Sequence, residues 1–175
     1  ETIRPVNKIV GPGNIYVTVA KKMLYGKVDI DMIAGPSEVM IIADENANPE
    51  YVAADLLSQA EHDKMAASIL VTTSMETAEK TAEEIEKQLK SLSREEIARE
   101  SIDKNGLIVV VENLDDAFLV ANEIAPEHLE LELENPFEYI GKVRNAGAIF
   151  LGKYTPEPVG DYFAGPNHVL PTNMT

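Results

Sequence analysis

The 175-residue sequence contains no cysteine. Disulfides, thiolate metal sites and a cysteine nucleophile are therefore excluded within this chain. Because disulfides are rare where thiols are kept reduced, their absence fits a cytoplasmic protein, and we expect that location.

Basic residues and long apolar runs are also scarce. The chain has 15 Lys and Arg against 30 Asp and Glu, a formal net charge of −15. This charge disfavours phosphate backbones and anionic lipid, so we expect no nucleic-acid partner and no membrane partner. No run approaches the roughly 18 consecutive apolar residues of a membrane-spanning helix. An acidic surface mostly indicates solubility, and it favours the hypothesis of a cationic substrate only modestly.

The ends of the chain do not look like natural termini. The sequence does not begin with Met, and its first residues, ETIRPVNKIVGPG, lack the basic region and apolar stretch of a secretory signal. Because both ends stop abruptly, we expect a piece of a longer protein.

Short β-branched runs alternate with amphipathic segments along the chain. Strands are predicted within 8–13, 30–35, 39–44, 68–73, 107–112, 129–133 and 147–151, and helices at 14–24, 49–62, 75–92, 114–124 and 137–146. The near-continuous apolar run at 107–112 is expected to be covered on both sides. The Gly- and Pro-rich segment after 151 is expected to be irregular. The alternation predicts an α/β fold: a mainly parallel, doubly wound, incomplete Rossmann-like sheet with helices on both faces.

The first cluster of ligand-type side chains is SQAEH at 58–62, at the end of a predicted helix. Gln59 and His62 are three residues apart and therefore share one helix face. His is a common zinc ligand, and a Gln oxygen is a less usual one. The spacing alone favours an ordinary polar helix end, and a metal site is the alternative.

The second cluster is APEHLEL at 125–131. Pro126 is expected to end the preceding helix, which places Glu127 and His128 on a turn at the start of the next strand. Ligands of open α/β sheets bind near the carboxyl ends of the strands. The pair therefore stands at the wrong edge unless its strand runs antiparallel.

The third cluster is GDYFAGPNHVLPT at 160–172, which contains Asp161 and His168. Long irregular segments in compact domains are usually functional, so Asp161 is a candidate metal carboxylate, although a packed surface loop remains an equal alternative. Two glycine turns, GPGN at 11–14 and GPSE at 35–38, could present N–H groups to phosphate. Both lack a full dinucleotide fingerprint and are weak signals.

Taken in order, GPGN, IDMIAGPSEV, DLLSQAEH, APEHLEL and GDYFAGPNHVLPT closely resemble the motifs of histidinol dehydrogenase. The resemblance extends over essentially all 175 residues and is highly specific. Members of this family are more than twice as long, so the chain is similar to the middle of one.

The resemblance implies an enzyme that oxidises L-histidinol through L-histidinaldehyde to L-histidine, the last step of histidine biosynthesis, with two NAD⁺ at a zinc-dependent site. It also implies a homodimer in which a further zinc-binding histidine comes from the partner subunit. No such residue is present here, and the family's other NAD contacts lie upstream of residue 1. The implied domains are 1–35, the end of an NAD-side Rossmann-like domain, and 36–175, a larger Rossmann-like domain carrying the metal and catalytic residues.

Functional residues follow from the resemblance position by position. The zinc ligands fall on Gln59, His62 and Asp161, and the catalytic pair falls on Glu127 and His128. The matching substrate contacts are Ser37, Gln59, His62, His128, Asp161 and His168, and Asn14 matches a cofactor contact. One departure is PTNM at 171–174, where many members have glycine after PT.

The missing cysteine bears on the implied chemistry. Aldehyde oxidation often forms a thiohemiacetal on cysteine, so its absence favours direct hydration to a gem-diol with a carboxylate base. We expect Glu127 to activate water and His128 to accept the alcohol and gem-diol protons. The metal would act chiefly as a template that orients the substrate nitrogens.

Three other interpretations remain open at this point. One is that the piece is an inactive fragment of that enzyme. A metal-dependent hydrolase could use Gln59, His62 and Asp161 to activate water. A non-catalytic α/β binding module would leave these residues incidental.

Overall fold

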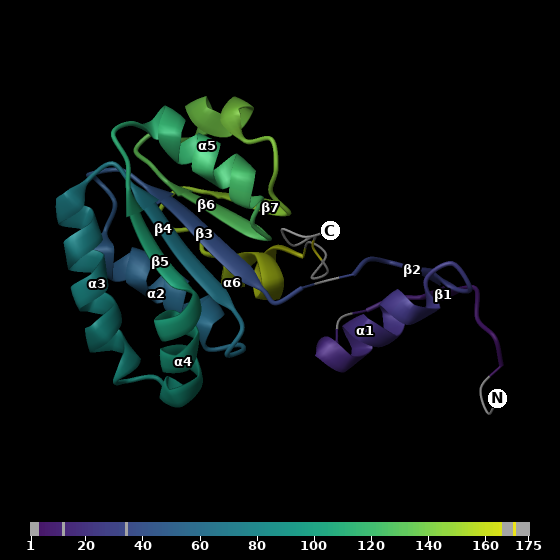
Figure 1. Cartoon of the computed structure of the whole chain (residues 1–175). Coiled ribbons are helices and arrows are strands. Elements are labelled where there is room, and N and C mark those ends of the chain that lie inside the picture. Colours follow the sequence, from purple (N-terminus) through teal and green to yellow (C-terminus); the bar gives the residue numbers. More distant parts are fainter. Residues whose placement is uncertain (1–3, 12, 34, 166–169, 171–175) are drawn as a thin grey trace.

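The computed structural model describes residues 4–11, 13–33, 35–165 and 170 (Figure 1). Its main sheet has five strands in the order β5-β4-β3-β6-β7, and every pair is parallel. The strands are β3 (Glu38–Ala43), β4 (Ala67–Thr72), β5 (Gly106–Val110), β6 (His128–Glu132) and β7 (Ala148–Leu151). The chain thus adds strands on one side of β3 and then crosses to the other side, which confirms the predicted doubly wound α/β sheet.

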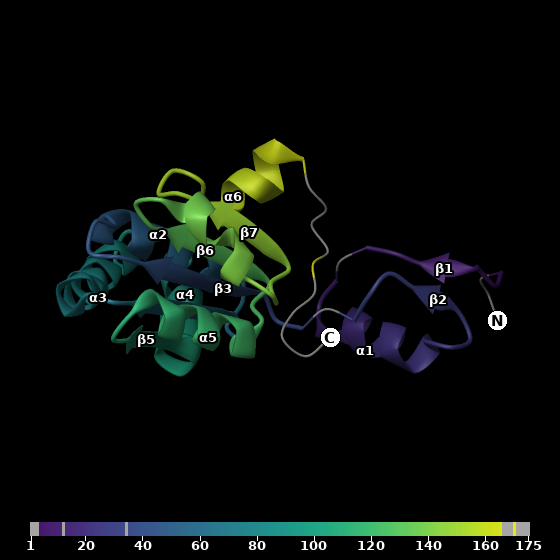
Figure 2. The ribbon, with the colours of Figure 1, turned by 90° about the horizontal axis from the view of Figure 1, so that it is seen from above.

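Helices cover both faces of this sheet. α2 (Pro49–Ala60), α3 (Met75–Leu89) and α4 (Glu95–Asn105) pack on one face, and α5 (Leu114–Ile124) with the 3-10 helix η1 (Pro136–Lys142) lies on the other. After β7, α6 (Glu157–Val159) continues into the π-helical turn η2 (Gly160–Ala164). Figure 2 shows α6 and α5 on opposite sides of the sheet. Among the described helices, none has the length and apolar character needed to span a membrane.

The central strand β3 explains the position of the core. Val39 and Ile41 point into the layer with α2, whereas Met40 and Ile42 point into the layer with α5, and all four are fully buried. A strand covered on both faces needs such a continuous apolar run. The helix that follows begins as predicted, with the Asn48 side chain accepting a hydrogen bond from Glu50 N–H at 3.0 Å.

Several predicted elements differ from the structure. The sequence pattern missed α4, whose N-cap Arg94 makes no side-chain capping bond and gives no start signal. The helix expected at 137–146 is the shorter 3-10 helix η1, and the segment after 151 is not wholly irregular because it contains α6 and η2. β5 is an edge strand: Ile108 packs on the α2 side and Val109 on the α5 side, but Leu107 is half exposed, so the strand has only part of the expected cover on both sides.

The first part of the chain forms a separate small unit. β1 (Lys8–Ile9) and β2 (Asp29–Ile30) pair in parallel and flank α1 (Ile15–Leu24), away from the main sheet in Figure 1. The buried Lys21 ammonium donates to Asp31 Oδ1 at 2.7 Å, and Gly11 N–H donates to Asp31 Oδ2 at 2.7 Å, so this ion pair fixes the glycine turn. β1 and β2 belong to a different sheet from β3, but the domain boundary at Gly35–Pro36 stays a prediction.

The polar side chains that alternate along β6 point into the protein rather than into solvent. Glu130 lies beside Ile41 and Glu132 beside Ala43, two β3 residues that belong to the α2 layer. Both glutamates are almost completely buried, at 2% and 3% exposure. Burial raises the pKa of Glu132 to about 8 and that of Glu130 well above its ordinary value.

These buried carboxyls predict that the chain loses stability as pH rises. Between the ordinary pKa of 4.5 and the folded value of about 8, Glu132 holds a proton that the unfolded chain has lost, so the free energy of unfolding falls with pH. Urea unfolding in chelator-treated buffer should show a fall of roughly 2–5 kcal/mol between pH 5 and 8.5.

The matched variants are Glu132→Gln, which carries no titrating group, and the exposed neighbour Glu134→Gln. The first should flatten the pH dependence and the second should leave it unchanged. An equally steep dependence in Glu132→Gln would assign the effect to other groups.

Candidate functional site

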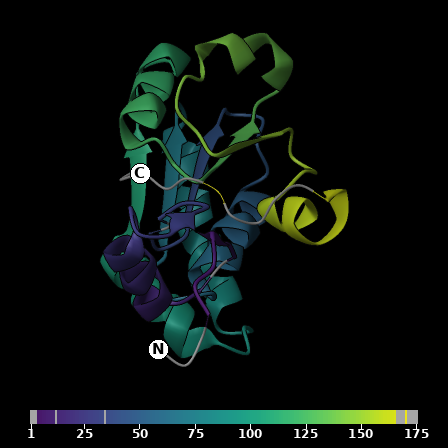
Figure 3. The same ribbon diagram turned by 90° about the vertical axis from the view of Figure 1, so that its right-hand side faces the viewer.

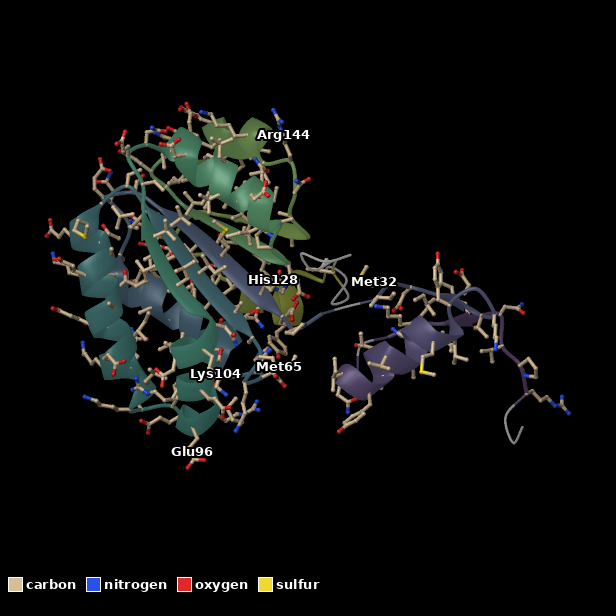
Figure 4. All side chains as sticks on the ribbon, in the orientation of Figure 1. Met32, Met65, Glu96, Lys104, His128 and Arg144 are labelled. Carbon is tan, nitrogen blue, oxygen red and sulfur yellow. The ribbon has the colours of Figure 1, made fainter. Side chains whose placement is uncertain are left out.

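The Glu127–His128 pair lies at the amino edge of the main sheet, between the starts of β3 and β7. Ala148 N–H donates to the Glu127 carbonyl at 2.8 Å, and His128 is the partner of Val39 in the parallel register. β6 therefore does not run antiparallel, and the pair stands at the edge opposite to the usual ligand position. Figure 4 shows His128 at this edge.

The helices explain why functional groups gather at this edge. A helix that connects two parallel strands begins near the carboxyl edge and returns to the amino edge, so α2 ends at the same edge at which β6 begins. The segment after β7 also returns along the sheet, because Glu157 N–H donates to Glu130 Oε1 at 2.7 Å on the α2 face. Figure 3 shows this yellow segment next to the blue α2.

The backbone before the pair has an unusual conformation. Ala125 ends α5 with φ 53° and ψ 58°, and among the described residues it alone combines a side chain with a positive φ. The helix thus ends before Pro126 as predicted, but through a left-handed residue. This turn carries the chain directly into the buried start of β6.

Glu127 is buried with its carboxylate held in place. Glu38 N–H donates to Glu127 Oε2 at 3.2 Å, and the Ser37 side chain also hydrogen-bonds to it. Burial raises the pKa of Glu127 to about 7, and the two hydrogen bonds act in the opposite direction. A carboxyl with this pKa can exchange a proton at neutral pH, as a general base requires.

His128 is buried beside it and is held by a backbone carbonyl. Its Nδ1 lies 3.2 Å from the Glu38 carbonyl oxygen, which can only accept, so a neutral ring carries its proton on Nδ1 and leaves Nε2 as the basic nitrogen. Burial lowers the pKa of His128, which favours that neutral form. The pKa of Glu127 is thus raised, whereas the pKa of His128 is lowered.

Gln59 and His62 lie at the end of α2, as the motif predicts. Gln59 is 1% exposed and its Oε1 has no hydrogen-bond partner among the described residues. His62 is exposed, one turn further along, and its charge acts on the pKa of His128. An orphaned buried oxygen beside an accessible imidazole is a donor set that a metal ion would satisfy.

Asp161 lies near His128, together with Glu157, a residue that the sequence pattern missed. Ligand atoms of His128, Glu157 and Asp161 all lie within 4.8 Å of one another. Glu157 is 1% exposed, and burial with a hydrogen bond to Asp161 raises its pKa to about 8. Its four-residue spacing from Asp161 is the one signal in the sequence that could have found it.

These observations fit a metal ion at the amino edge. Glu157 Oε2, like Gln59 Oε1, is buried without a partner in the described part of the chain. Nitrogen and oxygen donors of the kind that zinc accepts are thus present at one edge. The structure brings Asp161 to His128. The predicted substrate contact His168 lies outside the described residues.

Ser37 and the predicted cofactor contact Asn14 line one cavity of about 210 Å³, together with Asp63 and Met65. The Asn14 side-chain oxygen accepts from Tyr16 N–H and Val17 N–H at 3.1 and 3.2 Å, so it already caps α1. Capping is a sufficient structural reason for an asparagine at this position. Its cofactor role therefore stays a prediction.

Comparisons with known proteins agree with the motifs. The family model described as histidinol dehydrogenase matches residues 1–175. Curated histidinol dehydrogenases from Caldanaerobacter subterraneus subsp. tengcongensis and Listeria monocytogenes are 66% and 61% identical over the whole chain, which covers 41% of each relative.

Solved structures give the same result. A histidinol dehydrogenase from Elizabethkingia anophelis has a TM-score of 0.93 at 48% identity, over 99% of this chain and 40% of that one. A gamma-glutamyl phosphate reductase from Thermotoga maritima, with a TM-score of 0.55 at 14% identity over 85% of this chain and 42% of that one, shares the fold alone. The chain therefore belongs to the histidinol dehydrogenase family and spans about 41% of the length of the curated relatives it matches.

Proposed function

We propose that the protein containing this chain oxidises L-histidinol to L-histidine through L-histidinaldehyde, as the last step of histidine biosynthesis. The observation that carries the proposal is the buried Glu127–His128 pair, whose Asp161 neighbour lies within metal-bonding reach of His128. One carboxyl has its pKa raised to about 7 and the imidazole has its pKa lowered, so both can serve as bases near neutral pH.

The first step needs a base for the substrate hydroxyl. His128, neutral and held through Nδ1 by the Glu38 carbonyl, would accept the hydroxyl proton at Nε2 while the carbon loses a hydride. Bound zinc would orient the substrate nitrogens, and bound NAD⁺ would take up the hydride. Gln59, His62 and Asp161 would hold the metal, and Glu157 would support Asp161 through their hydrogen bond.

The second step needs activated water. Glu127 would take a proton from water as the water oxygen adds to the aldehyde carbon, while His128 returns the alcohol proton to the aldehyde oxygen, which gives a gem-diol and a neutral imidazole. His128 would then accept a gem-diol proton as the second hydride leaves, and the acid forms. The hydrogen bonds from Glu38 N–H and Ser37 hold the Glu127 carboxylate in a fixed orientation for this transfer.

We also propose that the protein acts in the cytoplasm as a homodimer, with the remaining zinc ligand supplied by the partner subunit. The resemblance supports this arrangement, since the chain has only His62, His128 and His168. Zinc and NAD⁺ titration of the 175-residue piece against the full-length protein would show whether the piece is active by itself.

Glu127→Gln in the full-length protein should block aldehyde oxidation by at least 100-fold, because the amide cannot accept the water proton. Alcohol oxidation should keep much of its rate, since His128 is unchanged. Rapid-reaction measurement of reduced nicotinamide with histidinol and with histidinaldehyde would separate the two halves. Equal loss in both halves would refute the separate roles.

The same carboxyl predicts the pH dependence of the second half-reaction. Because the base must be ionised, the rate should rise with pH through about 7, the pKa of Glu127, and then level off. Glu127→Gln should lose this rise. A wild-type rate that is flat between pH 6 and 8 would exclude Glu127 as the base.

His128→Gln should slow both oxidations by about 100-fold or more, because both release a proton to the imidazole.

His62→Gln should instead lower the zinc content, measured by atomic emission after dialysis, whereas the control Glu61→Gln should retain it. Unchanged rates in His128→Gln would overturn the base assignment, and unchanged zinc in His62→Gln would favour a non-catalytic module. Turnover without nicotinamide would favour the metal-dependent hydrolase.

A further inference from the structure

Further along the same strand, β6 builds a second group of acidic side chains with Asp55 of α2. Ligand atoms of Asp55, Glu130 and Glu132 all lie within 4.8 Å of one another. Glu130 and Glu132 are on the α2 face because they are the register neighbours of Ile41 and Ala43. The group therefore lies between the sheet and α2, within the protein.

The carboxylate oxygens of this group have too few donors. Glu130 Oε2 and both Glu132 oxygens are buried without a hydrogen-bond partner in the described part of the chain. The Glu157 N–H serves only Glu130 Oε1, and Lys153, which is exposed, has the smallest effect on the Glu132 pKa. Because a buried unpaired carboxylate is very costly, the group must take up either protons or a cation.

The spacing of the oxygen atoms suits one cation. Ca²⁺ binds oxygen at about 2.3–2.6 Å, so ligands on opposite sides of the ion are about 4.6–5.2 Å apart. Separations within 4.8 Å therefore allow all three carboxylates to reach one ion. With oxygen donors alone, the set suits a hard divalent cation rather than a metal that prefers nitrogen or sulfur.

A cavity lies next to the group at the opposite edge of the sheet. It encloses about 420 Å³ at the ends of β3, β6 and β7, and Glu132 forms part of its wall. It opens between β3 and β6, where the strand order reverses, which is the usual position of a ligand crevice in doubly wound sheets. Asp44 in the same wall already accepts from Asn46 N–H and Glu134 N–H, both at 2.8 Å, so it shapes the cavity.

We propose that Asp55, Glu130 and Glu132 form a second cation site, which takes one hard divalent ion admitted through the cavity at the carboxyl ends of β3, β6 and β7. The site uses none of the residues to which the proposed reaction assigns a role. It offers three carboxylates and no nitrogen, whereas the amino edge offers imidazole and amide donors.

The test uses the full-length protein, loaded with zinc beforehand so that the amino edge is occupied. Ca²⁺ is titrated by calorimetry at pH 8, and Tm is measured with and without 5 mM Ca²⁺. We expect one Ca²⁺ per chain with a Kd below 1 mM and a Tm increase of several degrees. Glu132→Gln and Asp55→Asn should each weaken binding at least tenfold and abolish the Tm increase.

The matched control is Glu134→Gln, which removes a charge from the cavity wall without touching the three ligands. It should bind Ca²⁺ within twofold of the unchanged protein. No Ca²⁺ binding up to 10 mM would overturn the proposal and identify a carboxylic acid cluster that is neutralised by protons. Binding that persists in both Glu132→Gln and Asp55→Asn would also overturn it, because the ion would then be held elsewhere.

Discussion

The structure depends on one constraint: β6 carries ionisable side chains into the layer between the sheet and α2, where water is excluded. Its alternation places His128, Glu130 and Glu132 on the face where β3 presents Val39, Ile41 and Ala43. Burial in this layer is favourable for the apolar β3 side chains, whereas it disfavours the charged forms of the β6 side chains. Every shifted pKa on this face has burial as its largest cause.

The path of the chain determines at which edge of the sheet these groups gather. α2 and the segment after β7 both return toward the amino edge, so Gln59, His62 and Asp161 arrive where β6 begins. A crevice also exists at the carboxyl edge, but in this chain its wall contains Asp44 and Glu132 rather than the Glu127–His128 pair. The cavity therefore lies at the edge where ligands usually bind in doubly wound sheets, and the pair lies at the opposite edge.

The sequence predicted the fold well where its signals are local. Apolar runs identified β3 and β4, and the helix predicted from residue 49 begins where α2 does. The prediction failed where local signals are weak, since α4 begins without a capping side chain. The apolar run of β5 looked like a covered strand because sequence cannot distinguish an edge from a centre.

The site was predictable only in part, for a related reason. The motifs predicted Glu127, His128 and Asp161 as site residues, but alternation on β6 would place Glu130 and Glu132 in solvent, as on a half-exposed strand. Their burial depends on α2 and α6, which are remote in sequence and cover the same face. Glu157 escaped attention because its position between two prolines suggests a turn rather than a buried ligand.

The different local partners of these carboxyls explain why one strand can support two kinds of chemistry. Glu127 receives hydrogen bonds from Glu38 N–H and Ser37, which offset part of the burial and keep its pKa at about 7. Glu132 receives none from the described residues, and its pKa rises to about 8. A partly stabilised carboxylate can release and accept a proton during each turnover, whereas an unsupported one must remain neutralised. The hydrogen bonds from Glu38 N–H and Ser37, together with the acidic neighbours Asp55 and Asp44 of Glu132, thus distinguish the proposed catalytic base from the proposed cation ligand.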